Sequence, residues 1–221
     1  MSNSKVTVVD YGVGNLYSVQ RALEYCGAAS VTIGSSPADI ETADRLILPG
    51  VGAFADGMTG LAERGLINPI RRYAHSGRPM LGICLGMQML ASKSEEFGLH
   101  DGLDLIPGRV VPIPHLRPDG TVRKIPAIGW FNLGFRNERN TQSSVFGVLP
   151  KEGAMYLVHS YHFKTDSEAD LVATYDYDGV SITAAVQRGN IIGLQFHPEK
   201  SGALGLGIIA SFLADQGRES P

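Results

Sequence analysis

Short apolar runs alternate along the first half of the chain with segments whose apolar residues recur every three or four positions. Four of the short runs are rich in β-branched or aliphatic residues and predict strands: Lys5–Asp10, Ser30–Ile33, Arg45–Leu48 and Pro79–Ile83. After the first of them, one face of a predicted helix carries Leu16, Val19, Leu23 and Cys26, and Gly27 follows at the usual helix end. Strands and helices that alternate in this way favour an α/β fold with a parallel sheet covered by helices.

The pattern changes in the second half of the chain. From about Arg109 to Asp178, short β-like runs are broken by Pro, Gly and Asp, which predicts hairpins and loops added to the sheet. Two further runs, Ile182–Val186 and Ile191–Phe196, frame the turn residues 187–190 and predict a β-hairpin. A last helix is predicted from about Ser201, with four apolar residues facing inward: Ile208, Ile209, Phe212 and Leu213.

Length and composition fit one globular unit. The 221 residues suffice for one well-buried core, so a single domain over residues 1–221 is expected. Hydrophobic residues make up 43% of the chain and the net charge is -3, so nothing indicates a nucleic acid or an anionic membrane as a partner. No apolar run reaches the roughly 18 residues of a membrane span, and two cysteines cannot make a disulfide framework. The sequence therefore predicts a cytoplasmic protein.

Cys84 lies in the most informative stretch of the sequence. The apolar predicted strand 79–83 runs directly into it, and a helix-compatible segment follows. Gly82 and Gly86 flank the cysteine at two residues on each side, which is the thiol form of the nucleophile elbow, a sharp strand-to-helix turn that exposes the reactive atom. A helix N-terminus also favours the thiolate. We expect Cys84 to be a nucleophile, whereas Cys26, on the apolar face of a helix, fits a structural cysteine.

A cysteine nucleophile needs a base that later protonates the leaving group, and histidine suits this role near neutral pH. Of the six histidines, His197 has the most suitable setting, because an apolar strand ends there and Glu199 follows two residues later. Parallel strands end at one edge of a sheet, and Glu199 can orient the imidazole as the third member of a triad. His159 is the alternative base, with less support because no carboxylate follows it until Asp166.

Acyl transfer from an amide also needs N–H donors for the carbonyl oxygen. The backbone amide of Leu85, directly after the nucleophile, is expected to be one donor, and the glycine-rich loop 49–54 is expected to supply the second. Gly12 and Gly14 lack a third glycine at position 17, which argues against a dinucleotide site. His159 and His162 have no recognisable metal-ligand spacing with Cys84. The sequence therefore predicts neither a metal nor a cofactor.

Together these motifs resemble the class I glutamine amidotransferases. The elbow Gly82–Gln88, the loop Pro49–Phe54 and the segment His197–Glu199 occur in the family's order across most of the chain. The resemblance implies a flavodoxin-like open, mostly parallel sheet with helices on both faces and added β-hairpins. It also implies that glutamine is hydrolysed to glutamate and ammonia through a thioester at Cys84. By the same resemblance, the glutamine site includes Gly52, Gln88, Ser160 and Tyr161, and Val51 or Gly52 gives the second oxyanion donor.

A second set of residues resembles one branch of that family, in which a glutaminase subunit passes ammonia to a separate, barrel-shaped cyclase in histidine biosynthesis. These residues are Asp10–Leu16, Ser18–Gln20 and the longer ending His197–Ser201. The resemblance implies a heterodimer with the cyclase, and Asn15 and Lys200 are hypothesised interface contacts. A helix cap and an ordinary surface lysine are the alternative interpretations of these two residues. The family often has Gly-Trp-Asn in mid-chain, whereas Phe131 intervenes here in Gly129–Asn132.

Three alternatives stay open. The chain could be a glutaminase that serves a different synthase, although the stretch Asp10–Leu16 and the ending Lys200-Ser201 argue against it. The same scaffold could be a non-catalytic binding module, although all three members of the predicted triad are present. A cysteine peptidase also fits the chemistry, because an elbow and a triad do not name the acyl group.

Overall fold

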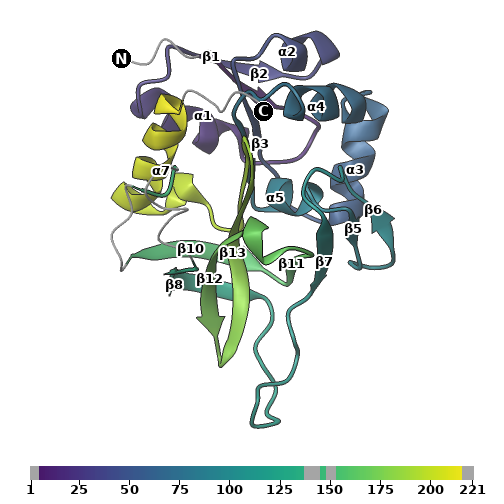
Figure 1. Cartoon of the computed structure of the whole chain (residues 1–221), viewed down its shortest axis with the longest axis vertical. Coiled ribbons are helices and arrows are strands. Elements are labelled where there is room, and N and C mark those ends of the chain that lie inside the picture. Colours follow the sequence, from purple (N-terminus) through teal and green to yellow (C-terminus); the bar gives the residue numbers. More distant parts are fainter. Residues whose placement is uncertain (1–4, 137–144, 148–152, 216–221) are drawn as a thin grey trace.

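An eight-stranded sheet runs through the molecule (Figure 1) in the order β2-β1-β3-β4-β14-β13-β12-β9. The computed structural model describes residues 5–136, 145–147 and 153–215. The parallel strands are β2 (Ser30–Gly34), β1 (Lys5–Val9), β3 (Arg45–Leu48), β4 (Met80–Ile83) and β14 (Ile191–Leu194). The antiparallel strands are β13 (Val180–Arg188), β12 (Leu171–Tyr177) and β9 (Gly134–Phe135). The strands and the hairpin predicted in these places are confirmed, and the sheet is open and mostly parallel.

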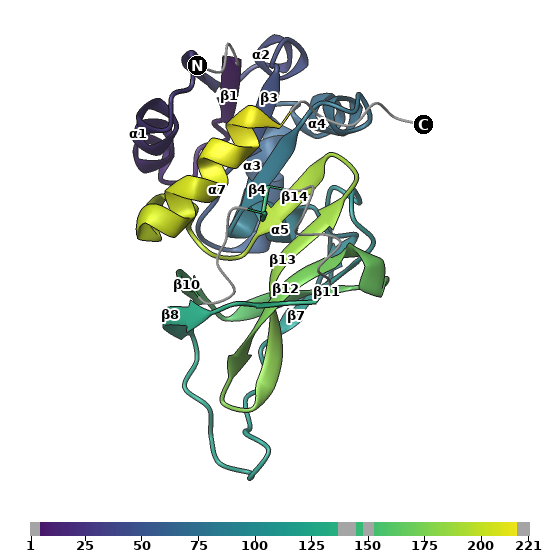
Figure 2. The ribbon, with the colours of Figure 1, turned by 60° about the vertical axis from the view of Figure 1, so that its left-hand side comes forward.

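Helices cover both faces of this sheet. One face carries α1 (Leu16–Tyr25) and α7 (Gly202–Ala214), which lie side by side in Figure 2. The other carries α2 (Pro37–Glu41), α3 (Phe54–Glu63), α4 (Ile67–Ala74) and α5 (Leu85–Met89). Successive residues of a strand point to opposite faces of the sheet, so they pack in two separate hydrophobic cores. Val8 packs with α1 and α7, whereas Val9 packs on the face covered by the other helices. Each aliphatic side chain buried in this way stabilises the fold by about 1.5–3 kcal/mol.

The predicted helices lie where the apolar periodicity placed them. The inward face of α1 includes the buried Val19 and Leu23, and all four predicted residues of α7 are buried. The Asn15 side-chain oxygen accepts a hydrogen bond from the backbone N–H of Ser18 (3.3 Å) and so caps the start of α1. Across residues 5–136, 145–147 and 153–215, every helix is too short or too polar to cross a bilayer.

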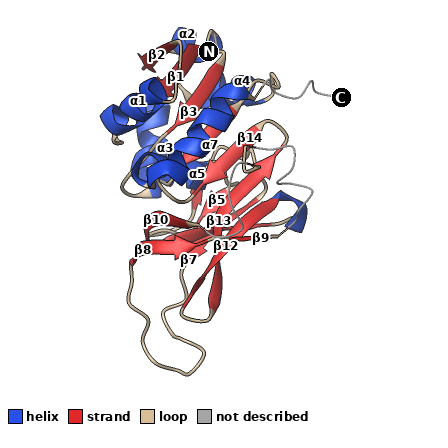
Figure 3. Cartoon of the chain, turned by 90° about the vertical axis from the view of Figure 1, so that its left-hand side faces the viewer, coloured by secondary structure: helices blue, strands red, loops and turns tan. Residues whose placement is uncertain are grey.

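The middle of the chain builds two smaller sheets beside the main one. The first has the order β11 (Tyr161–Thr165), β7 (Gly108–Pro112), β5 (Lys93–Ser94), β6 (His100–Asp101), and the second pairs β10 (Ala154–His159) with β8 (Ala127–Asn132). Two 3-10 turns complete the described elements, η1 (Glu168–Asp170) and η2 (Pro198–Lys200). Figure 3 shows most of these strands at the end of the molecule away from the helices.

The expectation that residues 109–178 only add hairpins to the main sheet is partly wrong. β12 does join that sheet next to β13, but β7, β8, β10 and β11 pair in separate sheets. β10 and β11 are consecutive in sequence, yet β10 pairs with β8 and β11 pairs with β7. Such pairing depends on the cores that the strands cover rather than on the turns between them, so local turn signals do not predict it.

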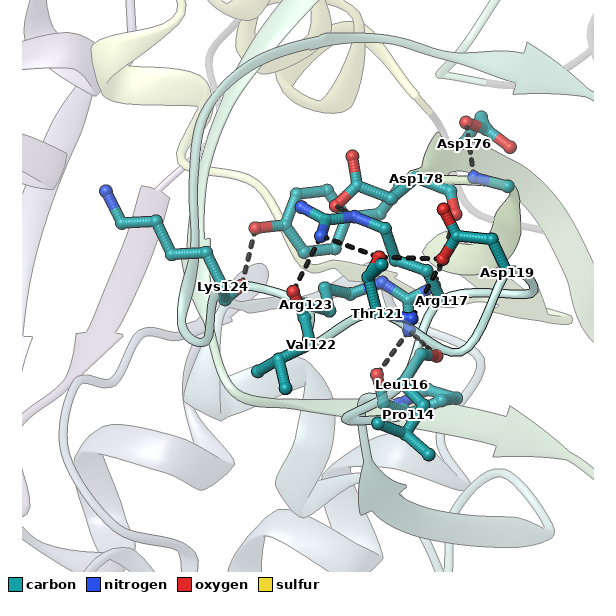
Figure 4. Close-up of polar contacts among 12 residues, drawn as sticks. Pro114, Leu116, Arg117, Asp119, Thr121, Val122, Arg123, Lys124, Asp176 and Asp178 are labelled. Atoms are coloured by element: carbon teal, nitrogen blue, oxygen red, sulfur yellow. Dashed lines mark hydrogen bonds and ion pairs between the residues drawn. The ribbon is translucent and has the colours of Figure 1, made fainter.

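A long loop, residues 113–126, connects β7 to β8 and projects from the end opposite the helices (Figure 1). Arg123 braces it from inside: the residue is 1% exposed, and its guanidinium donates hydrogen bonds to the backbone oxygens of Pro114, Leu116 (3.0 Å) and Asp178 (3.2 Å). Arg117 forms an ion pair with the Asp178 carboxylate at 2.9 Å. Figure 4 shows these contacts tying the loop to the turn between β12 and β13.

Both ends of this loop meet the same region of the fold. At its start, the backbone N–H of Ile113 donates to the Ser160 carbonyl oxygen at 2.9 Å, between β10 and β11. At its end, Pro126 lines a cavity that also contains Ser160. The loop therefore contributes to that cavity through Pro126.

The inserted Phe131 lies on the inner side of β8. Its ring packs against Tyr175 (4.7 Å between centroids) and Tyr177 (5.6 Å). Its neighbour Trp130 points the other way, is 55% exposed and contacts Tyr156 across the β8–β10 pair. The insertion thus adds an aromatic side chain beneath the small sheet and leaves the tryptophan on the surface.

Candidate active site

Cys84 sits at a sharp turn between β4 and α5, as its flanking glycines predict. Its backbone has φ 55°, a left-handed conformation that is unfavourable for a side chain with a Cβ. The turn is held by the Cys84 N–H, which donates to the Leu194 carbonyl oxygen at 2.7 Å. A Cβ on Gly86 would lie 1.7 Å from the Leu48 carbonyl oxygen, so only glycine allows α5 to approach β3 this closely. The turn thus combines a left-handed cysteine with a glycine that no other residue can replace.

His197 and Glu199 follow β14, which is the parallel neighbour of β4 in the sheet. Leu194 pairs with Ile83, so the residues after both strands emerge at one edge. The Nδ1 atom of His197 is 2.9 Å from Oε1 of Glu199, whose side chain is only 1% exposed. Since Nδ1 donates to this carboxylate, Nε2 is left for Cys84, with which the His197 side chain is also hydrogen-bonded. The structure therefore brings the three residues of the predicted triad together.

Opposing effects act on the charge of His197. Burial disfavours the imidazolium, but hydrogen bonds and charge interactions with Cys84 and Glu199 outweigh burial and raise the pKa of His197 from 6.5 to about 9. Around neutral pH the imidazole therefore carries a proton that it can give to a leaving group. A buried imidazolium between a cysteine and a carboxylate is an arrangement suited to acid–base chemistry.

This pKa leads to a prediction on stability. A histidine with a higher pKa in the folded state contributes stability that is complete below pH 6.5 and is lost as the pH rises through about 9. We expect the free energy of unfolding to fall between these values, and Glu199→Gln to reduce the fall because a cause of the raised pKa is removed. Urea unfolding at four pH values from 6 to 9 measures it. Glu168→Gln, at a side chain that is 82% exposed, is the matched control, and an equal slope in Glu199→Gln contradicts the prediction.

A cavity of about 310 Å³ opens beside Cys84, which is within the usual size of small-molecule sites. Nine of the twelve residues that line it were singled out from the sequence: Val51, Gly52, Cys84, Leu85, Gln88, His159, Ser160, Tyr161 and His197. Glu199 lies behind His197, and Asn15 lines a much smaller cavity of about 10 Å³ together with Glu199 and Val51. Lys200 is exposed on η2, next to the predicted triad.

The loop 49–54 is held against the elbow by a buried tyrosine. The Tyr11 hydroxyl donates to the Pro49 carbonyl oxygen at 2.6 Å, and burial raises the pKa of Tyr11, so the phenol stays protonated. A Cβ on Gly50 would lie 2.2 Å from that hydroxyl. Gly52 has φ +99°, a conformation that side chains rarely adopt. The loop thus presents its backbone to the cavity, and the second oxyanion donor from Val51 or Gly52 stays a prediction.

Sequence reasoning missed Glu96, Pro126 and Val158 as lining residues of the cavity. The Glu96 carboxylate accepts a hydrogen bond from the backbone N–H of Phe54 at 2.6 Å, which fixes it at the start of α3. Glu96 follows the two-residue strand β5, too short for a periodic signal. No signal in the sequence therefore indicated that its acidic side chain reaches the cavity.

The alternative base, His159, is occupied by other partners. Its Nδ1 lies 2.8 Å from the Tyr161 carbonyl oxygen and its Nε2 lies 2.8 Å from the Tyr175 hydroxyl. Burial lowers the pKa of His159 to about 4, so the ring is neutral at physiological pH. The structure thus gives the alternative base no free nitrogen for a reacting thiol. Within the described part of the chain, no three His, Cys, Asp or Glu side chains are grouped as metal ligands would be.

Fold and site together define the class of this protein: an α/β enzyme with a strand-to-helix cysteine, a carboxylate-paired histidine and a small-molecule cavity at one sheet edge. The chain belongs to the class-I glutamine amidotransferases, because the model of the family described as "Glutamine amidotransferase class-I" matches residues 7–215.

Curated relatives cover almost the whole chain. A protein of Legionella pneumophila (strain Paris), "Imidazole glycerol phosphate synthase subunit HisH 1", is 50% identical over 95% of this chain and 99% of its own length. One of Syntrophotalea carbinolica, "Imidazole glycerol phosphate synthase subunit HisH", is 44% identical over 94% and 98%. Among solved structures, PurLQS from Thermotoga maritima shares the fold at 20% identity, with a TM-score of 0.69 over 96% of this chain and 98% of that one.

Proposed function

We propose that this chain is the glutaminase subunit of an imidazole glycerol phosphate synthase, acting as a single glutamine amidotransferase domain. The observation that carries the proposal is that Cys84 and His197 line one cavity while Glu199 pairs with His197, in a chain 43–50% identical to subunits named for that enzyme. The two cysteines are free thiols, which fits a cytoplasmic enzyme.

In the proposed reaction, His197 first gives a proton to the leaving group and then regains one from water. The Cys84 thiolate attacks the γ-carboxamide carbon of glutamine, and the carbonyl oxygen becomes an oxyanion facing the Leu85 amide and an amide of the loop 49–54. When this tetrahedral adduct collapses, the imidazolium of His197 protonates the departing nitrogen and ammonia leaves. The neutral imidazole then takes a proton from water, which attacks the thioester and releases glutamate. Glu199 keeps the imidazole oriented and stabilises its charged form.

Gln88 and Glu96 are proposed to hold the substrate. Both N–H groups of the Gln88 amide are used inside the protein, on the Tyr161 carbonyl oxygen (3.0 Å) and on Oε1 of Gln195 (3.0 Å). The remaining oxygen of Gln88 suits an N–H of the substrate. The Glu96 carboxylate suits the α-ammonium group of glutamine. The backbone at Ser160 and Tyr161, fixed by Ile113 and Gln88, forms the opposite wall.

The partner is proposed to be a barrel-shaped cyclase that covers the mouth of the cavity. Free ammonia would be lost to solvent, so its acceptor enzyme has to dock where the ammonia leaves. Asn15 and Lys200 lie on this side of the triad and are our proposed interface contacts, with the exposed Val51 between the cavities. Trp130 reaches the same region, because it contacts Tyr156, whose ring is 6.4 Å from that of His197.

Glutamate release from glutamine tests the proposal. We expect turnover by the purified protein to rise roughly tenfold or more when the cyclase, loaded with its phosphorylated substrate, is added. The same assay with the synthase partners of other amidotransferases is the control, because the proposal expects no rise with them. A rise with another synthase would leave the glutaminase chemistry intact and replace the pathway. No release under any of these conditions would contradict glutamine as the substrate.

A further inference from the structure

Gln195 is a buried amide beside the sulfur of Cys84. It is 0% exposed and lies on the edge of the sheet between β14 and His197. Its Nε2 is 3.8 Å from the Sγ atom of Cys84, a distance at which an N–H can reach the large sulfur atom. A fully buried polar side chain is costly unless its groups are paired. The burial of Gln195 next to the proposed nucleophile therefore suggests that its amide has a function there.

The orientation of the Gln195 amide is fixed by its neighbour Gln88. The Tyr161 carbonyl oxygen can only accept, so the side-chain group that Gln88 turns towards it is the NH₂ (3.0 Å). The same nitrogen is 3.0 Å from the Gln195 side chain, so Gln195 must present its oxygen there. Its NH₂ is then directed at Cys84. The donor that faces the sulfur thus follows from the hydrogen-bond chemistry of the network.

A second pair of residues locks the far end of this network. His159 also contacts the Tyr161 carbonyl oxygen, through Nδ1 at 2.8 Å, so this nitrogen holds the proton. Nε2 of the neutral ring then accepts from the Tyr175 hydroxyl at 2.8 Å. Every donor from Tyr175 to Cys84 has one possible direction. The side chains in this network are all buried, so each of their hydrogen bonds is costly to break.

We propose that Gln195 is a further catalytic residue, which donates a hydrogen bond to the Cys84 sulfur and favours the thiolate over the thiol. The role of the sulfur rests on the proposed function. A hydrogen bond to the charged form of a group stabilises that form, and His197 supplies the other polar contact of the sulfur. Gln195 thus donates a hydrogen bond to the sulfur from the end of β14, and His197, which protonates the leaving group, makes a second hydrogen bond to it.

The rate of alkylation of Cys84 by iodoacetamide, measured against pH, tests this role. The background is Cys26→Ala, so that Cys84 is the reacting thiol. Gln195→Met keeps the volume of the side chain and removes the donor. We expect the midpoint of the profile to rise by about one pH unit, a tenfold change in the balance between thiol and thiolate. The plateau rate at high pH is expected to rise about two- to threefold, because a less stabilised thiolate is a better nucleophile.

Gln195→Glu provides a second variant with an unchanged shape. Its carboxylate can still accept from Gln88 but repels a thiolate, so the midpoint is expected to rise further than in Gln195→Met. Gln187→Met on β13 is the matched control, because the side-chain amide of Gln187 donates to the Gly189 carbonyl oxygen in the adjacent turn and does not line the cavity. Its profile should coincide with that of the Cys26→Ala background.

Two results would overturn the role of Gln195. The first is an unchanged midpoint in Gln195→Met when thermal unfolding shows that the variant is folded. The second is a larger shift in Gln195→Met than in Gln195→Glu, which is the order that loss of packing alone would produce. Alkylation uses neither glutamine nor the cyclase. The outcome is therefore independent of whether the proposed function is correct.

Discussion

Cys84→Ala is expected to abolish glutamine hydrolysis, with glutamate release falling by at least about 10⁴-fold in the presence of the loaded cyclase. The reason is that the thioester needs a sulfur at the elbow, and alanine offers no atom that could replace it. Alanine at this position, with its φ of 55°, is strained to the same degree as cysteine because both residues carry a Cβ. The fold is therefore expected to persist. Glutamate release at saturating glutamine is the measurement.

Cys26→Ala is the matched control for this variant. Cys26 is half-buried at the end of α1, and its thiol donates to the Leu206 carbonyl oxygen at 3.4 Å, away from the proposed site. Turnover in Cys26→Ala should stay within about twofold of the parent. The Cys84→Ala protein should still support the cyclase when ammonium salt replaces glutamine. Turnover above about 1% of the parent in Cys84→Ala would contradict the thioester mechanism.

Gly86→Ala is expected to destabilise the fold by more than about 3 kcal/mol. Its Cβ would lie 1.7 Å from the backbone oxygen of Leu48, in the middle of the parallel sheet, where neither α5 nor β3 can move away cheaply. The free energy of unfolding from urea titration is the measurement. For a chain of this size the melting temperature should fall by roughly 10 °C.

Gly134→Ala is the matched control on β9, at the edge of the same sheet. A Cβ there would be 3.8 Å from the Thr174 carbonyl oxygen, an ordinary contact, and the expected change is within about 1 kcal/mol. Equal stability in Gly86→Ala and Gly134→Ala would mean that the elbow can open without cost. That result would remove the argument that Gly86 is required for the strained turn.

The parts of the fold that the sequence predicted are those with local causes. The elbow around Cys84 follows from two glycines and a strand within five residues, and the pair His197 and Glu199 lies two residues apart. The β13–β14 hairpin has its turn signal in residues 187–190, between strands that pair as predicted. Each of these features is decided by neighbours in the chain, so the residues alone were sufficient.

The parts that the sequence did not predict depend on partners far away in the chain. Glu96 enters the cavity because β5 pairs with β7, and a strand of two residues has no period to detect. In the sequence, Gln195 is only a polar residue at the end of an apolar strand. Its orientation is set by a hydrogen bond from Gln88, which lies more than a hundred positions earlier. Arg123 is a surface-type residue by composition, yet the loop closes around its guanidinium. Such contacts are properties of the assembled core.

The position of β14 has a consequence for how the enzyme is made. A ribosome delivers Cys84 more than a hundred residues before His197, and β14 then has to enter between β4 and β13, in the interior of the sheet. Until that strand emerges, β4 and β13 both present unpaired edges, and the sulfur has neither its histidine nor the carbonyl of Leu194 that holds its turn. A nascent or truncated chain that lacks β14 and His197 is therefore expected to be inert towards glutamine.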